Sequence, residues 1–272
     1  MPDDLLAMLE GPDIAPPWVV PDFLVENEIV VLAGEAGAGK SILSYALAIA
    51  LATGNSFLTR QLTPTRVLYC DEENPYYTRR QYLRWAWRGL GAPRTLLREN
   101  LRVESLQLTN AGPGGWNARL ARMAQEHQAR LIIVDTTTPA CHIVDENDNG
   151  EATRAVTKLR GAMLASPGSS MIVLRHARQD PESGKYKPRG ASAWVGATDG
   201  TILHSYIQGA PATKDPEKVG LRNTRLTPAK VRAFGLRTPI WIVPRWTGPE
   251  GERGIELSIR QSSEEEPSRD AH

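Results

Sequence analysis

The apolar residues of this chain gather in short, unbroken runs that are separated by longer amphipathic segments. Apolar runs of strand length span residues 28–33, 66–70, 131–134 and 171–174. Segments of helical length alternate with them, at residues 41–53, 77–90, 116–128 and 151–164. Strands that are apolar throughout and alternate with helices are typical of a parallel sheet covered on both faces. The pattern therefore predicts an α/β fold with a mostly parallel central sheet.

The pattern changes after residue 190, and three shorter apolar runs follow, at residues 200–203, 239–243 and 254–259. We expect these runs to be antiparallel strands that complete the sheet. Residues 1–17, rich in Pro and Asp, predict an extended arm, and residues 18–260 predict a single domain. The polar, acidic residues 261–272 predict a disordered tail.

Composition narrows the class of protein. The 272 residues include 32 Lys and Arg and 31 Asp and Glu, so the formal net charge is +1. A strongly basic nucleic-acid coat protein is thereby excluded, and any polyanion must bind a local patch. Cys70 and Cys141 lack the spacing of a zinc site or a disulfide framework. Because no signal peptide or membrane-spanning segment is visible, we expect a cytoplasmic protein with no membrane partner.

One segment matches the phosphate-binding pattern G-x-x-x-x-G-K-[ST] at every fixed position, between a predicted strand and a predicted helix. Its glycines let backbone N–H groups face phosphate oxygens, and the helix N-terminus adds positive charge. Lys40 would reach the β- and γ-phosphates, and Ser41 would hold Mg²⁺. The expected nucleotide-binding residues are Gly34, Glu35, Ala36, Gly37, Ala38, Gly39, Lys40, Ser41 and Ile42.

Two other predicted strands end in carboxylates. Asp135 follows four apolar residues, as in the strand whose Asp holds the hydration shell of Mg²⁺ in P-loop enzymes. Asp71, Glu72 and Glu73 close the strand at residues 66–70, at the edge of the sheet where ligands bind. Because an NTPase needs a carboxylate there to orient the attacking water, Glu72 or Glu73 is the candidate.

A histidine and a basic loop follow the apolar run at residues 171–174. His176 would lie at the same edge of the sheet, where it can hydrogen-bond the γ-phosphate or its water. The loop that follows contains Gly, Pro and four basic residues, and it is too polar for a core. Such a loop can contact phosphates of nucleic acid or of a nucleotide held by a neighbouring subunit. Its basic residues are Arg178, Lys185, Lys187 and Arg189.

In this order, the motifs resemble the RecA-type core of ring-forming ATPases. The most similar branch is that of the RepA-like replicative helicases of plasmids, and DnaB-like helicases and RadA- and KaiC-like ATPases are more distant. The resemblance spans about residues 18–204 and rests on the P-loop, the lead-in before it, and the residues that close the later strands. It implies a RecA-like P-loop NTPase fold with ATP and Mg²⁺ as cofactors.

The resemblance also implies roles for the site residues. Glu73 is the catalytic carboxylate rather than Glu72, because the branch has its catalytic Glu two residues before a Pro. His176 matches a γ-phosphate sensor, and Arg189 matches an arginine finger supplied to the adjacent subunit. The implied catalytic set is Lys40, Glu73, Asp135, His176 and Arg189, with Ser41 and Asp135 at the metal.

The resemblance further implies a homo-oligomer, with a ring of six as the family expectation. The loop after His176 faces the central channel in such rings, so Arg178, Lys185 and Lys187 are implied to bind single-stranded DNA. The chain departs from the branch at Arg175, which occupies the place of a first His, and at Gln179, where Lys is common. The family's account of how the sensor signals to the DNA-binding loop therefore does not carry over to this chain.

Three functions fit these motifs. The favoured one is an ATP-driven nucleic-acid motor, a hexameric DNA helicase of replicative type that acts on single-stranded DNA. A RecA/RadA-like recombination ATPase is an alternative, although the chain lacks the extra domain that recombinases often carry. The third is a regulatory ring ATPase with a protein partner and no DNA role. The Trp- and Arg-rich segment at residues 84–88 fits helix packing at a subunit interface better than base stacking.

Overall fold

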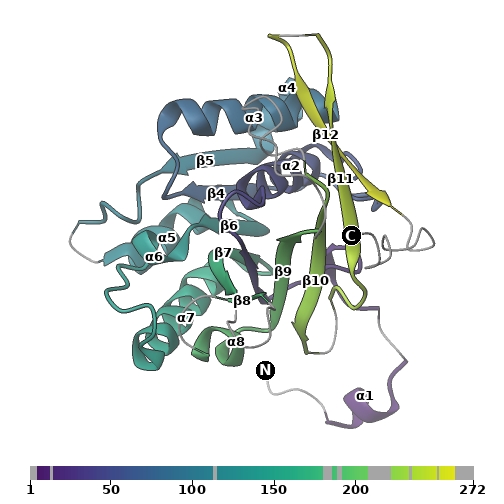
Figure 1. The fold of residues 1–272 in the computed structure, drawn as a ribbon. Helices are drawn as coiled ribbons and strands as arrows, with labels where there is room; N and C mark the ends of the chain where they lie inside the picture. The colour runs from purple at the N-terminus through teal and green to yellow at the C-terminus, as the bar shows by residue number, and fades with distance from the viewer. Residues whose placement is uncertain are drawn as a thin grey trace, which may run out of the picture.

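The computed structural model describes residues 5–12, 15–112, 115–179, 186–188, 192–207, 222–232, 235–249 and 251–260. A ten-stranded sheet runs through the molecule, with helices on both of its faces (Figure 1). None of the helices within these ranges is long and apolar enough to cross a membrane.

Six neighbouring strands form the parallel part of the sheet, which confirms the predicted fold class. The four inner strands are built from Val, Ile, Leu and Ala and are almost completely buried, as parallel strands covered on both faces must be. In spatial order the six strands are β9 (Gly200–Tyr206), β3 (Ile29–Gly34), β7 (Ser170–Gln179), β6 (Leu131–Asp135), β4 (Val67–Asp71) and β5 (Leu101–Ser105).

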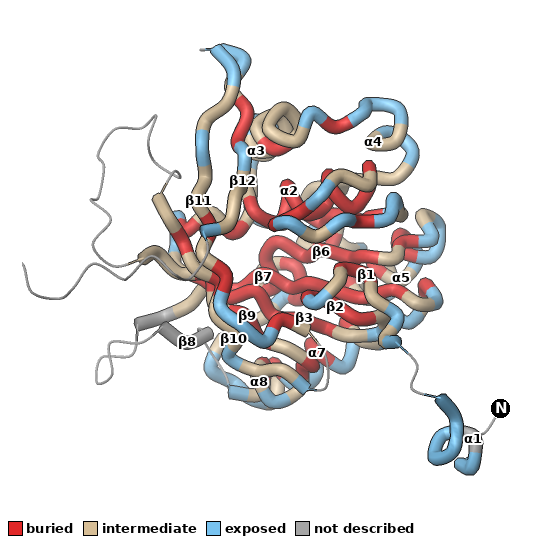
Figure 2. Tube along the Cα trace, turned by 90° about the vertical axis from the view of Figure 1, so that its right-hand side faces the viewer, coloured by how far each residue is buried: buried red, intermediate tan, exposed pale blue. Residues whose placement is uncertain are grey.

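Alternate residues of the strands enter two separate cores, one on each face of the sheet. Val30 and Leu32 of β3 join one core, and Ile29 and Val31 join the other. The first core is covered by α2 (Lys40–Thr53), α3 (Tyr76–Leu90) and α4 (Arg94–Asn100), and the second by α5 (Gly115–His127), α7 (Asn149–Leu164) and α8 (Ala193–Ala197). Figure 2 shows these strands and helix α2 as a buried layer, with more exposed helices such as α4 and α8 outside it.

Three antiparallel strands extend the sheet beyond β9: β10 (Thr224–Val231), β11 (Ile240–Thr247) and β12 (Gly254–Arg260), of which β11 and β12 were predicted. The expectation of an antiparallel strand at residues 200–203 is correct on one side only, because β9 is antiparallel to β10. β9 itself is parallel to β3, with Val31 opposite Thr201, because α8 carries the chain across the sheet before β9 begins. β10 was not predicted, since its sequence mixes apolar residues with Thr, Pro, Lys and Arg.

Helix α3 packs on β12 without intervening side chains. A Cβ on Gly89 would lie 1.8 Å from the carbonyl oxygen of Ile255, and a Cβ on Gly254 would lie 2.4 Å from the nitrogen of Gly89. Beside this contact, the rings of Trp85 and Trp246 meet edge to face with centroids 4.9 Å apart. Trp85 therefore packs within its own chain, and the subunit interface suggested for residues 84–88 stays a prediction.

The beginning of the chain differs from the predicted extended arm. Residues Leu5–Glu10 form a short helix, α1, because this segment is rich in Leu, Ala and Met and lies before Gly11 and Pro12. Its leucines are exposed, and α1 lies apart from the sheet in both views (Figures 1 and 2). Strands β1 (Trp18–Val20) and β2 (Leu24–Val25) then form a separate pair. The tail at residues 261–272 lies outside the described residues.

Several short elements carried no clear apolar signal. Strand β5 lies at the edge of the sheet and is only half-buried, so Arg102 and Glu104 alternate with its apolar residues and form an ion pair at 2.7 Å. The segment predicted as a basic loop contains a strand pair instead, in which β7 continues to Gln179 and pairs with β8 (Tyr186–Pro188). Within the described residues, eight short elements were not predicted from the sequence: α1, α4, α6 (Thr137–Ala140), α8, β1, β2, β5 and β8.

Candidate functional site

The loop between β3 and α2 is the P-loop predicted from the sequence. Gly37 and Gly39 have φ angles of 78° and 87°, a left-handed conformation that side chains other than glycine rarely adopt. At Gly34 a Cβ would lie 2.5 Å from the carbonyl oxygen of His204, so only glycine fits beside β9. The ammonium group of Lys40 donates to the carbonyl oxygens of Gly34 and Glu35 at 3.0 and 2.9 Å. The loop is thus shaped for phosphate oxygens, with its cation held inside.

Two buried carboxylates face this loop from neighbouring strands. Asp71 ends β4 and Asp135 ends β6, and the two residues are opposite each other in the parallel register. Asp135 accepts hydrogen bonds from Ser41 and, at 2.8 Å, from the hydroxyl of Tyr69. Burial, followed by the charge of Asp71, raises the pKa of Asp135 to about 7. The structure therefore brings together Ser41 and Asp135, the two residues predicted to hold a metal ion.

Glu73 lies just beyond β4, beside His176 of β7. The Nε2 atom of His176 is 3.5 Å from Oε1 of Glu73, and Thr136 also donates to this carboxylate. The hydrogen bond from His176 lowers the pKa of Glu73, although partial burial opposes this shift. Nearly half of the Glu73 side chain remains exposed, with 45% of its surface accessible. Glu73 is therefore ionised and within reach of water.

Glu72 points the other way and is buried. It accepts hydrogen bonds from the backbone N–H groups of Leu108 and Thr109, at 3.2 and 2.9 Å, and from the Thr109 hydroxyl at 2.8 Å. These bonds tie the end of β4 to the segment after β5. The geometry separates the two candidate carboxylates, because Glu72 is occupied by the backbone and Glu73 faces the P-loop.

Two tyrosines next to the carboxylates were missed by sequence reasoning. Tyr45 donates to Asp71 at 2.6 Å, and its ring stacks on that of Tyr69 with centroids 4.0 Å apart and planes 5° apart. The sequence did hold a signal for them. Tyr45 lies four residues after Ser41 on α2, so it faces the same way as a predicted site residue, and Tyr69 lies two residues before Asp71, a carboxylate that closes β4.

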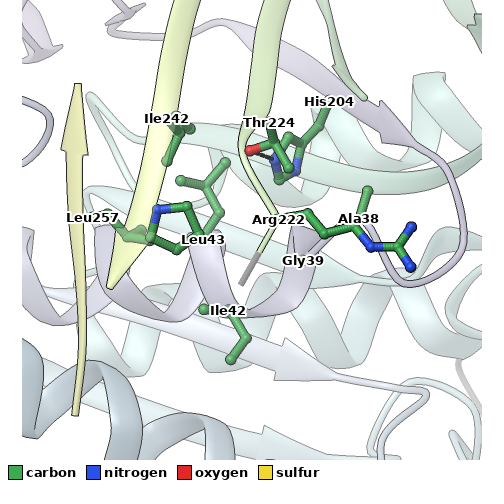
Figure 3. A pocket seen from close by; sticks show the side chains of 10 residues that line it. Ala38, Gly39, Ile42, Leu43, His204, Arg222, Thr224, Ile242 and Leu257 are labelled. Atoms are coloured by element: carbon green, nitrogen blue, oxygen red, sulfur yellow. Dashed lines mark hydrogen bonds between the residues drawn. The ribbon is translucent and has the colours of Figure 1, made fainter. Parts of the chain in front are cut away.

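A pocket opens beside the P-loop, between the start of α2 and the antiparallel strands (Figure 3). It is a shallow, open depression, and most of its lining is apolar. Arg222 lies at its rim with the guanidinium 4.9 Å from the centroid of the Tyr206 ring, and the Tyr206 hydroxyl donates to the carbonyl of Gly37. The pocket is lined by Ala38, Gly39, Ile42, Leu43, His204, Arg222, Thr224, Ile242, Pro244 and Leu257.

His204 forms the floor of this region and is buried. Its Nε2 atom hydrogen-bonds the hydroxyl oxygen of Thr224 at 2.8 Å, and its Nδ1 atom has no hydrogen-bond partner among the described residues. Burial, together with the positive charge of Lys40, lowers the pKa of His204 to about 3. The imidazole is therefore neutral in the folded protein at neutral pH.

Because the His204 imidazole is neutral in the folded protein, we expect the unfolding free energy to fall at acid pH. Below pH 6.5 the unfolded chain protonates His204 and the folded chain does not, so stability present above that pH is lost as the pH falls toward 3. Between about pH 7 and pH 5, we expect the wild-type protein to lose roughly 2 kcal/mol more unfolding free energy than the His204→Gln variant. Urea unfolding of both proteins at each pH measures this difference. Equal losses would contradict the prediction.

Only some of the basic residues predicted after His176 belong to the described part of the chain. Arg178 and Lys187 are register partners in the β7–β8 pair, but their side chains lie outside the described part. Lys185 and Arg189 lie wholly outside the described residues. Arg175 occupies the position where the RepA-like helicases have a His. It is buried, with its guanidinium 4.1 Å from the ring centroid of Trp194. It also donates to the hydroxyl of Thr137 at 2.8 Å, so it connects β7 to α6 and α8.

Comparison with known proteins places this geometry in context. Residues 1–182 match the model of a family described as AAA domain. Among solved structures, the crystal structure of a KaiC-like protein from the hyperthermophilic archaeon Pyrococcus horikoshii OT3 matches with a TM-score of 0.54. The match covers 88% of this chain and 93% of that chain, and the sequences are 12% identical. At this identity the likeness shows a shared RecA-like fold.

Proposed function

This chain belongs to the AAA domain family and has the core of a RecA-like P-loop ATPase, and we propose that it hydrolyses ATP with Mg²⁺ to move along single-stranded DNA. The observation that carries the ATPase part is the convergence of four elements on one edge of the sheet. The P-loop, Asp135, Glu73 and His176 come from β3, β6, β4 and β7, and they lie within contact of one another through Ser41 and Thr136.

The residues present fit a magnesium-bound triphosphate. Gly37 and Gly39 of the loop adopt left-handed φ angles, which lets backbone N–H groups turn toward a phosphate. Ser41 and Asp135 offer hydroxyl and carboxylate oxygens, the ligand atoms that Mg²⁺ prefers, directly or through its bound water. When bound, Mg²⁺ neutralises charge on the phosphate oxygens. Lys40 is positioned to transfer its hydrogen bonds from two backbone carbonyls to phosphate.

The remaining side chains divide the work of the reaction. Glu73, ionised and part-exposed, accepts a proton from water and orients it for in-line attack. His176 holds Glu73 by a hydrogen bond and lies where it can contact the γ-phosphate. The shallow apolar pocket beside Ile42 and Leu43 offers a surface for the base of the nucleotide, because its lining suits contact with a flat ring.

The motor function is proposed because the end of β7 connects His176 directly to basic residues. Only one residue separates His176 from Arg178, and Arg178 and Lys187 face each other across the β7–β8 pair. A change in the Glu73–His176 contact during hydrolysis can therefore reach a basic strand pair through one continuous strand. This arrangement suits a nucleic-acid contact that changes with nucleotide state. A hexameric ring with Arg189 as an arginine finger in trans is part of the proposal, as the resemblance implies.

ATPase assays with and without single-stranded DNA test the motor. We expect DNA to stimulate hydrolysis, and the stimulation to fall as salt rises, because phosphate contacts release counterions. Replacing both Lys185 and Lys187 by Ala should remove the stimulation and leave the basal rate. Lys158→Ala, on the exposed side of α7, is the matched control and should behave like the wild-type protein. A rate that is indifferent to DNA at every salt concentration would overturn the motor proposal.

A regulatory ring ATPase with a protein partner is the second candidate, and the fold shared with a KaiC-like protein is compatible with it. Both functions require the same nucleotide site, so the ATPase prediction stands under either. Images of the particle with a bound ATP analogue separate the remaining options, since a ring fits both candidates and a filament fits a recombination ATPase. Indifference to DNA combined with a ring would select the regulatory function.

A further inference from the structure

Two buried phenols stand between α2 and the sheet and contact the two buried carboxylates. The Tyr45 hydroxyl donates to Oδ2 of Asp71, and the Tyr69 hydroxyl donates to Oδ2 of Asp135. Both rings are completely buried, and their near-parallel stacking fixes the distance between the two hydroxyls. Each carboxylate therefore receives one hydrogen bond from a rigid donor.

The first of these hydrogen bonds leads to Glu73. Asp71 uses its other oxygen to accept from the backbone N–H of Asn74 at 2.8 Å and from that of Glu73 at 3.3 Å. The amide of Asn74 also donates to both Asp71 oxygens at 3.2 Å. Asp71 thus caps the turn that presents Glu73, and Tyr45 holds Asp71 from the opposite side.

The second hydrogen bond leads to Ser41. Asp135 accepts from Ser41 as well as from Tyr69, so its carboxylate is fixed between α2 and β4. Tyr45 lies one helical turn after Ser41, and it is the residue that stacks on Tyr69. The same face of α2 therefore meets both carboxylates, one through the P-loop serine and one through a phenol.

We propose that Tyr45 and Tyr69 are positioning residues of the ATPase reaction, which act on two different steps. Tyr45 fixes, through Asp71, the turn that carries the catalytic Glu73, and Tyr69 fixes the orientation of Asp135 opposite Ser41. This inference rests on the proposed ATP hydrolysis, and it is independent of any DNA role. Groups that orient a catalytic or metal-binding residue by hydrogen bonds are worth roughly 10–100-fold in activity or metal affinity.

The two Phe variants are predicted to differ in which constant they change. Tyr45→Phe keeps the stacked ring and should lower kcat about tenfold with little change in the KM for ATP. Tyr69→Phe should raise the Mg²⁺ concentration needed for half-maximal binding of a fluorescent ATP analogue about tenfold. The binding titration requires no turnover, so it separates metal placement from chemistry. Tyr82→Phe is the matched control, because the described residues include no hydrogen bond from its hydroxyl to either carboxylate.

A double-mutant cycle guards against a purely structural effect. Asp71→Asn should lower kcat as Tyr45→Phe does, and the double variant should be no slower than the slower single variant, since both act through one contact. Thermal unfolding of each variant shows whether the fold is intact. The inference would be overturned if both Phe variants kept the wild-type kcat and Mg²⁺ dependence. It would also be overturned if all constants changed equally and in proportion to the loss of stability. A wild-type protein that hydrolyses no ATP would instead overturn the proposed function together with it.

Discussion

Glu73→Gln is expected to bind ATP as the wild-type protein does and to hydrolyse it at least about 100-fold more slowly. The substitution keeps the size of the side chain and removes the negative charge that accepts a proton from water. In the folded protein this carboxylate is ionised, with hydrogen bonds from His176 and Thr136 that favour its charged form. Single-turnover hydrolysis measures the loss of rate, and titration with a fluorescent ATP analogue measures binding.

Glu72→Gln is the natural comparison, because the two residues are neighbours with opposite surroundings. Glu72 accepts hydrogen bonds from two backbone N–H groups and one hydroxyl, so its loss of charge should lower the unfolding free energy by about 1.5–3 kcal/mol. We expect its rate of hydrolysis to stay near that of the wild-type protein wherever the variant is folded. Loss of turnover in Glu72→Gln, with turnover retained in Glu73→Gln, would transfer the catalytic role to Glu72.

Lys40→Ala has the second large expected effect, and it removes binding as well as hydrolysis. Charge-assisted hydrogen bonds are worth about 1.5–3 kcal/mol, so ATP affinity should fall roughly 10–100-fold, and turnover should fall further because charge on the phosphates grows during the reaction. Burial lowers the pKa of Lys40, but the carboxylates of Asp135, Glu73 and Glu35 oppose that shift and favour its charged form. Isothermal titration with ATP and Mg²⁺ measures the affinity.

A surface lysine provides the control for this variant. Lys158→Ala removes the same side chain from the exposed side of α7 and should leave affinity and rate unchanged. Thermal unfolding establishes whether Lys40→Ala is folded, which matters because the ammonium group joins two carbonyls of the loop. Unchanged ATP affinity in a folded Lys40→Ala protein would contradict the phosphate-binding role of this loop.

The parts of the fold predicted correctly share a strong and local signal. The four inner strands are unbroken apolar runs, and α2 begins and ends at glycines in a left-handed conformation. The P-loop pattern and the carboxylates that close β4 and β6 then follow from position, since parallel strands place their carboxyl ends on one edge. Glu73 and His176 meet for this reason, although they are about a hundred residues apart in sequence.

What escaped prediction depends on partners distant in the sequence. β5 and β10 contain many polar residues because they are only half-buried. Pairing with a neighbouring strand stabilises them. The direction of β9 depends on the route of the chain before it, which a run of apolar residues does not encode. Tyr45 and Tyr69 read as ordinary core aromatics until the register of β4 and β6 places carboxylates beside their hydroxyls.

The contact of Gly89 with Gly254 has a mechanical consequence. Because backbone touches backbone there, α3 and the β11–β12 hairpin cannot slide past each other by repacking side chains, and they form one stiff arm. One end of this arm begins at Pro75, two residues after Glu73, and its other end is the tip of the hairpin that projects beyond α3 and α4 (Figure 1). A tilt of α3 at its Pro75 end would therefore carry the hairpin with it, because helix and hairpin are joined backbone to backbone at the two glycines.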